Sequence, residues 1–208
     1  IVRHGGNFFG VLLSRTDRSE TIDLNHRNRH SYVLIILSSG TILGGVLKVR
    51  DLVTMMPLQL TIRRAQPADI PQIVAIERMV FIDPWGERTL RESLILYPDM
   101  FFVALNNGDV AGFATAAVED TGDELYGHIM NIAVAPEYQR RGIGKRLIRR
   151  MEQEFLIAGA SGSQLEVRIT NTSAQEFYRR LGYREVFQIS CYYANEEDAL
   201  VMMKWFRF

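Results

Sequence analysis

The sequence is poor in cysteine and histidine and has no excess of either charge. Its 208 residues include one cysteine and four histidines, and lysine plus arginine and aspartate plus glutamate both total 24. The lone Cys191 excludes a disulfide within these residues and a cysteine-rich zinc site, and we expect no metal site. Nucleic-acid-binding proteins usually carry a basic excess, so we expect no nucleic-acid partner. Cysteine scarcity also fits the reducing cytoplasm, which we predict as the location.

Long apolar runs are scarce too, and only one uncharged stretch needs an explanation. Residues 31–47, SYVLIILSSGTILGGVL, contain no charged residue and have basic residues on both sides. A membrane-spanning helix needs about 20 strongly apolar residues, whereas this run includes three glycines, three serines and a threonine. It also lies too far from residue 1 for an ordinary signal peptide. We therefore favour a β-hairpin or a loosely attached extension over a membrane segment.

Residues 1–56 are poorly patterned and form a predicted N-terminal extension. Residues 15–30, RTDRSETIDLNHRNRH, show neither helical nor strand periodicity. The sequence begins with isoleucine, and Met55 and Met56 stand just before the first well-patterned strand. We hypothesise that translation naturally starts at these methionines, which intact-mass measurement of the native protein would test. The folded domain is predicted over residues 57–208.

From residue 58 onward the sequence predicts a mixed α/β fold, with a central β-sheet flanked by helices. Hydrophobic periodicity and turn residues give the order β-α-α-β-β-β-α-β-α-β-β, with no internal repeat. The residues NNGD at 106–109 predict a hairpin. In chain order the predicted segments are 58–65, 66–81, 83–94, the two strands within 100–120, 127–136, 144–160, 163–169, 172–182, 183–193 and 198–206.

Two of the predicted helices have a clear apolar face. The first helix has Asp69 as its predicted N-cap, and its apolar face consists of Ile70, Ile73, Ile76 and Val80. The apolar face of the helix over 144–160 consists of Leu147, Ile148, Met151 and Phe155. Both helices are therefore expected to pack against the sheet.

The stretch EYQRRGIGKRLIRRM, residues 137–151, places glycines and basic residues where the long helix begins. Free backbone N–H groups and the positive dipole end make such a start an anion site, and glycines allow close approach. A P-loop is excluded, because Arg146 replaces the hydroxyl residue and Gln139 replaces the first glycine. A dinucleotide fingerprint is excluded, because Leu147 replaces the third glycine.

The same loop resembles the pyrophosphate loop of the GNAT superfamily of N-acetyltransferases, whose pattern is R/Q-x-x-G-x-G/A. Residues 139–144, QRRGIG, fit this pattern without a gap. Residues 165–186, LEVRITNTSAQEFYRRLGYREV, are similar to the second signature block of the superfamily, and residues 128–134, HIMNIAV, to the strand before the loop. The resemblance covers residues 59–208 and implies the GNAT fold.

Within the superfamily, the sequence is most similar to the RimI-like ribosomal-protein alanine N-acetyltransferases and their archaeal relatives. They share the segments NIAV, LEVR and LGY, and a late segment that here reads CYYANEEDALVMM, residues 191–203. Residues 81–85, FIDPW, resemble the Phe-Pro-Trp loop of bacterial members. This loop departs from the family pattern, because Ile82 and Asp83 are inserted.

The resemblance implies direct acetyl transfer from acetyl-CoA to the N-terminal α-amino group of a protein, such as a ribosomal protein, in a ternary complex. Glu166 matches the general base of the family, and Tyr178 matches the acid that protonates the departing CoA thiolate. An amine pKa of about 8 and a phenol pKa of about 10 suit this chemistry at neutral pH. The implied acetyl-CoA-binding residues are Ile132, Ala133, Val134, Gln139, Arg140, Arg141, Gly142, Ile143, Gly144, Lys145 and Asn171.

Four further side chains are candidates for binding the acceptor. Trp85, Tyr192 and Tyr193 would line a peptide groove, and burial in the core is the alternative. His128 would orient the substrate, and a structural or solvated histidine is the alternative. Cys191 lies in a predicted strand, where a packing role is favoured over a covalent acetyl carrier.

Two rival functions remain open. The first is acetylation of a small amine, such as a polyamine or an antibiotic, by the same fold. The second is a non-catalytic acetyl-CoA-binding module, against which the presence of both Glu166 and Tyr178 argues. The sequence leaves the acceptor protein and the oligomeric state undefined.

Overall fold

The computed structural model describes residues 2–4, 7–12, 32–36, 47–48 and 59–206. The chain divides into two compact units, Ile1–Pro57 and Leu58–Phe208. The hypothetical translation start at Met55 and Met56 lies outside the described residues. No helix in the described part of the chain is long and apolar enough to cross a membrane.

The first unit contains a small antiparallel sheet. Its strands pair in chain order and are β1 (Val2–His4), β2 (Asn7–Leu12), β3 (Tyr32–Ile36) and β4 (Leu47–Lys48). β3 and β4 lie at the two ends of the uncharged run, and Tyr32 and Val33 pair with Lys48 and Leu47. This pairing agrees with the β-hairpin interpretation of that run.

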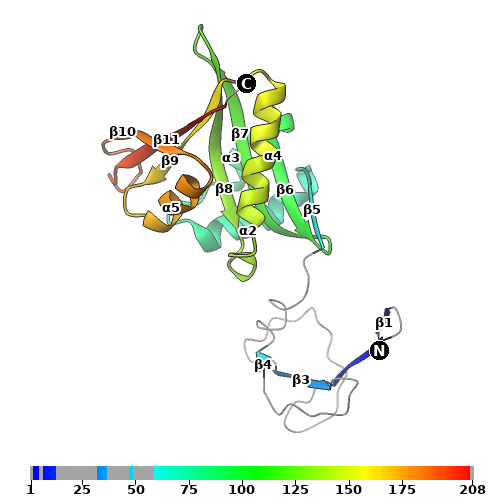
Figure 1. Ribbon diagram of the computed structural model, residues 1–208. Coiled ribbons are helices and arrows are strands. Elements are labelled where there is room, and N and C mark those ends of the chain that lie inside the picture. Colours follow the sequence, from blue (N-terminus) through cyan, green and yellow to red (C-terminus); the bar gives the residue numbers. More distant parts are fainter. Residues whose placement is uncertain (1, 5–6, 13–31, 37–46, 49–58, 207–208) are drawn as a thin grey trace. The chain divides into compact units, whose positions relative to one another are not determined.

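The second unit is built on a seven-stranded sheet with the order β10-β11-β9-β8-β7-β6-β5 (Figure 1). All neighbouring strands are antiparallel except β8 and β9, which are parallel. The strands are β5 (Leu60–Arg64), β6 (Phe101–Asn106), β7 (Asp109–Asp120), β8 (Leu125–Val134), β9 (Gly162–Arg168), β10 (Arg184–Ile189) and β11 (Ala199–Trp205).

Four α-helices cover this sheet. They are α2 (Ile70–Val80), α3 (Glu87–Leu96), α4 (Ile143–Ile157) and α5 (Thr172–Arg180). Short 3₁₀ turns precede α2, β6 and α4, at Pro67–Asp69, Pro98–Met100 and Pro136–Tyr138. The order of strands and helices confirms the predicted order β-α-α-β-β-β-α-β-α-β-β. The predicted NNGD hairpin joins β6 and β7, with φ of 53° at Asn107 and 95° at Gly108.

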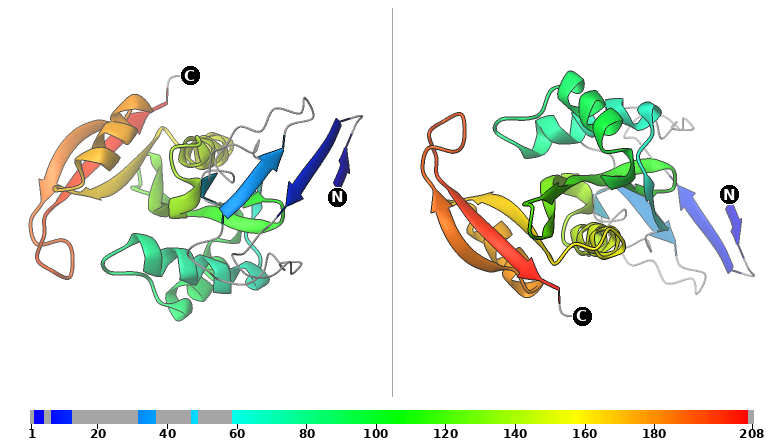
Figure 2. Two further views of the ribbon diagram at one scale, coloured as in Figure 1. Left: turned by 90° about the horizontal axis from the view of Figure 1, so that it is seen from below. Right: turned by 90° about the horizontal axis from the view of Figure 1, so that it is seen from above.

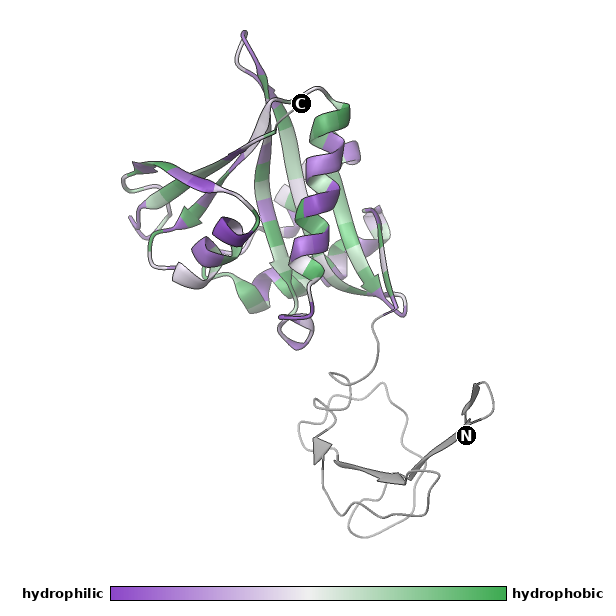
Figure 3. Ribbon diagram, in the orientation of Figure 1, coloured by the Kyte–Doolittle hydropathy of each residue, from purple (hydrophilic) through white to green (hydrophobic). Residues whose placement is uncertain are grey.

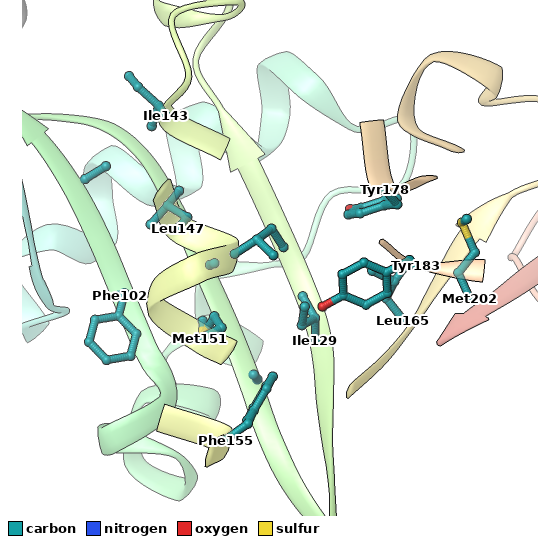
Figure 4. Close-up of a cluster of buried hydrophobic side chains, with 14 of the residues drawn as sticks. Phe102, Ile129, Ile143, Leu147, Met151, Phe155, Leu165, Tyr178, Tyr183 and Met202 are labelled. Atoms are coloured by element: carbon teal, nitrogen blue, oxygen red, sulfur yellow. The ribbon is translucent and has the colours of Figure 1, made fainter. Parts of the chain in front are cut away.

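The helices lie on two faces of the sheet, each with its own apolar cluster. Figure 2 shows α4 on one face and α2 and α3 on the opposite face. The α4 cluster also takes in Tyr178 from α5, Ile129 from β8 and Leu165 from β9 (Figure 4). The α2 cluster includes Phe113 from β7 and Ala133 from β8. Side chains on β8 and β9 that point away from α4 therefore lie on the α2 and α3 face.

The predicted apolar faces of α2 and α4 are largely confirmed. The side chains of Leu147, Ile148, Met151 and Phe155 are fully buried, and the outer side of α4 is mostly polar (Figure 3). On α2 the predicted face is buried except Val80, which is half-buried. The α2 face also buries a carboxylate that the pattern did not predict, Glu77, with no exposed surface.

The N-cap role predicted for Asp69 is corrected in part. Asp69 is the residue before α2, but its carboxylate makes no capping hydrogen bond to that helix. It instead forms a two-pronged ion pair with Arg63 on β5, at 2.7 and 2.8 Å, and accepts the Gln66 N–H at 2.7 Å. The guanidinium fork competes successfully for the carboxylate, because two hydrogen bonds to a cation hold it more strongly than the single backbone N–H bond of an N-cap.

Candidate functional site

The candidate site centres on the opening between β8 and β9. These strands pair only where Tyr126–Ile129 meets Gly162–Leu165, and Figure 1 shows them diverging beyond that point. Residues 132–134 pair with β7 on one side and lie past the β9 pairing on the other. A β-bulge at Met130, between the Ile129 and Asn131 pairings with β7, precedes this stretch. Ile132, Ala133 and Val134 thus lie where β8 can present backbone groups to a ligand.

The glycine loop joins this end of β8 to the start of α4. Gly142 caps α4 with φ of 80°, a left-handed conformation that glycine adopts without strain. The first backbone N–H groups of α4, from Ile143 to Lys145, have no acceptor within the helix, as at any helix start. Gln139 Nε2 donates to the Val134 carbonyl at 3.0 Å and ties the loop to β8. The loop and the helix dipole together form an anion-binding geometry.

Gly144 has a second role, in bringing α4 close to α5. A Cβ atom at this position would stand 3.3 Å from the Phe177 ring of α5, tighter than an ordinary contact. Phe177 packs edge-on against Tyr178, with ring centroids 5.1 Å apart. The absence of a side chain at Gly144 therefore helps to place the residue predicted as the catalytic acid.

Tyr178 is buried on the α4 side of the opening. Its exposure is 8%, and Figure 4 shows its hydroxyl end directed toward β8. Burial, and then the nearby Tyr193, raise the pKa of Tyr178 well above its ordinary value. The phenol is therefore protonated at neutral pH and able to act as a donor. Asn171 lies at the start of the same helix and caps it, accepting the Ala174 N–H at 3.1 Å.

Glu166 and His128 meet on the opposite face of the sheet. The alternation of β9 buries Leu165 and Val167 on the α4 face and points Glu166 to the other, as predicted. His128 Nε2 lies 2.7 Å from Glu166 Oε2, and its Nδ1 lies 2.5 Å from Glu119 Oε1. Burial lowers the pKa of His128, but Glu166 and then Glu119 outweigh it and raise the pKa to about 9. His128 is therefore an imidazolium at neutral pH.

A second charged cluster joins three loops beside this pair. Arg168, at the end of β9, contacts Glu197 Oε2 at 2.7 Å and Asp83 Oδ2 at 2.6 Å. Its guanidinium stacks on Tyr193, 3.8 Å from the ring centroid. Hydrogen bonds from Thr170, and then the pairing with Arg168, lower the pKa of Glu197 to about 2. The α2–α3 loop and the β10–β11 turn are thus held together by a charged network.

The carboxylate of Glu77 links the α2–α3 loop to β8. Its Oε2 accepts the Trp85 backbone N–H at 3.0 Å, and its Oε1 accepts Asn131 Nδ2 at 2.5 Å. Burial raises the pKa of Glu77, although these two donors partly offset the effect. Trp85 itself packs against the apolar cluster on the α2 face. The contacts of the Trp85 ring thus favour burial in the core over a place lining the peptide groove.

The structure brings several of the predicted residues to the β8–β9 opening, some on each face of the sheet. Glu166 and His128 are hydrogen-bonded, and Tyr192 and Tyr193 are close enough for the charge of Glu166 to raise the pKa of both phenols, after the larger effect of burial. Tyr178 reaches the opening from the other face of the sheet. The loop residues 139–145 lie at the start of α4.

The strand prediction for Cys191 is wrong. β10 ends at Ile189, and Cys191 lies exposed in the following turn with φ of 52°. Asp198 closes this turn by accepting the Cys191 N–H at 2.9 Å and Gln188 Nε2 at 2.5 Å. The apolar run that suggested a longer strand is thus interrupted by a side-chain-stabilised turn.

Several residues of the site were not predicted as part of it. Glu119, Glu77 and Asn131 carry no local signal, since only the pairing of distant strands and helices brings them to His128 and Trp85. Asp83 and Arg168 stand in motifs that the sequence did reveal, FIDPW and LEVR. Their ion pair joins positions 85 residues apart in sequence, which no spacing rule connects.

Comparison with known proteins places these features in a family. The model of the acetyltransferase (GNAT) family matches residues 70–183, from the start of α2 to just before β10. An N-alpha-acetyltransferase of Sulfurisphaera tokodaii is 34% identical over 150 residues, which is 68% of this chain and 90% of that protein. The ribosomal protein bS18-alanine N-acetyltransferase of Escherichia coli strain K12 is 32% identical over 147 residues, or 68% of this chain and 95% of that protein.

A solved structure agrees with the sequence comparison. The crystal structure of Chaetomium thermophilum Naa20 with a bisubstrate analogue matches with a TM-score of 0.65 and 28% identity. The match covers 70% of this chain and 86% of that one. With the splayed β8–β9 pair and the glycine loop at the start of α4, these matches show that the chain belongs to the acetyltransferase (GNAT) family.

Proposed function

We propose that the protein transfers an acetyl group from acetyl-CoA to the N-terminal α-amino group of a protein. One observation carries this proposal: a carboxylate, Glu166, and a protonated phenol, Tyr178, lie beside the β8–β9 opening on opposite faces of the sheet. Two such groups are what an amine needs to lose a proton and a thiolate needs to gain one. The names of the related acetyltransferases support the choice of a protein α-amine as acceptor.

The residues around the opening fit acetyl-CoA as co-substrate. The N–H groups at the start of α4 and the left-handed Gly142 form a cradle for the pyrophosphate. Lys145, Arg140 and Arg141 add positive charge to this loop. The side of β8 at residues 132–134 that lies past the β9 pairing offers backbone groups to the amide arm, and Asn171 lies at the start of α5 on the same opening. The donor set is basic and backbone-rich, as a diphosphate requires.

In the proposed reaction, the amine attacks the thioester carbonyl directly. Glu166 Oε1 takes the amine proton, directly or through a water, while His128 holds Oε2. The N–C bond forms, the C–S bond breaks, and the Tyr178 hydroxyl protonates the departing thiolate. A backbone N–H of residues 132–134 polarises the thioester carbonyl. Since the α-amine has a pKa of about 8, a carboxylate is a sufficient base near neutral pH.

The acceptor groove is proposed at the α2–α3 loop and the β10–β11 turn. Tyr192 and Tyr193 stand edge to face, 5.1 Å between centroids, and supply aromatic walls next to Glu166. The Arg168 network fixes Tyr193 and Asp83 in place. Such walls suit the first residues of an extended N-terminal segment, for example that of a ribosomal protein. The cytoplasm is the proposed location of the reaction.

The full 208-residue chain tests the proposal in a thiol-release assay. The acceptors are peptides that begin with alanine, serine or methionine, the same peptides with a blocked α-amine, and spermidine. We expect turnover only with the free α-amines. Turnover with spermidine alone would defeat the peptide proposal, and turnover with no amine would favour a non-catalytic acetyl-CoA-binding module.

Substitution of the proposed base gives a second test. Glu166→Gln keeps the shape of the side chain and its contact with His128, but it removes the proton acceptor. We expect turnover to fall by about 100-fold, with the Kd for acetyl-CoA, from calorimetry, within about twofold of the wild-type value. A collapse of acetyl-CoA binding instead would show that Glu166 is structural.

A further inference from the structure

His128 lies between two carboxylates that come from the strands on either side of it. Glu119 on β7 contacts Nδ1, and Glu166 on β9 contacts Nε2. A neutral imidazole has one N–H donor and would present a lone pair to one of the two carboxylates. The doubly protonated ring satisfies both. The geometry therefore selects the charged form of His128.

Strand register explains why the three side chains line up. His128 pairs with Ala117 on β7 and with Gln164 on β9. Glu119 and Glu166 each lie two residues beyond these partners and so point to the same face of the sheet. On the parallel β8–β9 pair, Glu166 lies toward the opening, whereas Glu119 lies toward the far end of β8, opposite Tyr126.

Exposure separates the roles of the two carboxylates. The side chain of Glu119 is 46% exposed, that of His128 is 19% exposed and that of Glu166 is 13% exposed. Glu166 is thus the inner group, next to the opening where the amine would react. Glu119 is the outer group, and its contact with the Glu166–His128 pair is to His128 Nδ1. Its second oxygen, Oε2, accepts Gln164 Nε2 at 3.4 Å, which helps to orient the carboxylate.

We propose that Glu119 is a positioning residue for acetyl transfer, holding His128 protonated and oriented so that its Nε2–H donates to Glu166 Oε2. This inference rests on the proposed function, in which Glu166 is the base. The hydrogen bond fixes the Glu166 carboxylate in one orientation and directs its Oε1 to the amine. Without Glu119, the imidazole is free to lose its Nδ1 proton and to rotate.

The other charged and titratable groups near Glu119, His128 and Glu166 are neutral or are paired with other residues. On the β10–β11 turn, Tyr192 lies near both carboxylates and Tyr193 lies near Glu166. Both are neutral phenols because burial raises their pKa, to about 12 for Tyr193. The charge of Arg168 is taken up by Glu197 and Asp83. Among the described residues, Glu166 and Glu119 are the groups that raise the pKa of His128.

The test is Glu119→Gln in the full chain, with Glu124→Gln as matched control. Glu124 lies in the same β7–β8 hairpin. Its Oε2 accepts a hydrogen bond from the Tyr126 hydroxyl at 2.5 Å and not from His128. Proton NMR follows the imidazole titration, and His128→Gln assigns the signal. We expect a wild-type midpoint near 9, a midpoint lower by at least about one unit in Glu119→Gln, and the wild-type value in Glu124→Gln.

Kinetics supply the second readout. For Glu119→Gln we expect kcat/KM for a free α-amine peptide to fall about tenfold near pH 7.5. The alkaline limb of its pH–rate profile should move to lower pH, and its affinity for acetyl-CoA should be unchanged. Glu124→Gln should match the wild type. An unmoved NMR midpoint, or a moved midpoint with an unchanged pH–rate profile, would overturn the proposal.

The proposed function and this inference fail in different ways. If Glu166→Gln retains full turnover, Glu166 is not the base and the proposed mechanism fails, whatever Glu119 does. If Glu166→Gln is inactive and Glu119→Gln behaves as the wild type in both readouts, only the positioning role fails. Thermal unfolding of each variant checks that the exchange at this exposed position leaves the fold intact.

Discussion

At the scale of single residues, His128 couples the chemistry of the site to the stability of the fold. Its pKa is about 9 in the folded chain, compared with about 6.5 when unfolded. Between these values the folded state binds one more proton than the unfolded state. The stabilisation is therefore complete below pH ~6.5 and is lost as the pH rises through about 9.

Urea denaturation across this pH range measures the effect. The free energy of unfolding should fall with rising pH by up to ~1.4 kcal/mol per unit on account of this group. His128→Gln should remove that slope. A slope that is the same in both proteins would show that His128 is not held as an imidazolium.

Tyr178 gives a prediction that separates catalysis from packing. Tyr178→Phe keeps the buried ring but removes the proposed proton donor, so kcat should fall about 100-fold with little change in melting temperature. Tyr183→Phe is the matched control, since this ring packs against Tyr178 at 5.9 Å and its hydroxyl pairs with Ser163 Oγ at 2.5 Å. The control should lose about 1 kcal/mol of stability and keep kcat. Equal kcat losses in both variants would indicate a packing effect.

At the scale of elements, the two ends of α4 allow a matched test of the glycine loop. Gly142 and Gly159 both have left-handed φ, 80° and 83°, and a Cβ at either position would meet no atom within 4 Å. Alanine at each position should therefore cost a similar ~1–2 kcal/mol of stability. Only Gly142→Ala should weaken acetyl-CoA binding, by about tenfold in calorimetry, since it disturbs the N–H groups of the cradle. If the two variants bound acetyl-CoA with equal affinity, this would contradict a pyrophosphate site at this loop.

Periodicity predicted the elements well because each signal is local. The α4 face of Leu147 and Met151 follows the helical repeat, and Glu166 alternates with Leu165 along β9. The strand before the β10–β11 turn was predicted too long, because the side chain of Asp198 ends it from seven residues away. Charged clusters such as Arg168 with Asp83 depend on which loops the sheet brings together, and no local pattern records that.

At the scale of the whole molecule, we propose that the second unit is the complete acetyltransferase domain. The seven strands of the larger sheet and its covering helices all lie within residues 60–205, and the family match lies within 70–183. Residues 56–208 alone should therefore unfold in one cooperative transition and bind acetyl-CoA within about twofold of the full chain. Loss of the transition or of binding would show that the first 55 residues are needed.

The proposed reaction requires that the acetyl group arrives on an α-amine and that Glu166 is the base. Tandem mass spectrometry of a peptide with a free N-terminal alanine and an internal lysine, incubated with acetyl-CoA and the full chain, locates the product. We expect acetylation of the α-amine with the wild type and its near absence with Glu166→Gln. Acetyl found on the lysine would rule out an α-amine acceptor, and an equal yield from Glu166→Gln would show that Glu166 is not the base.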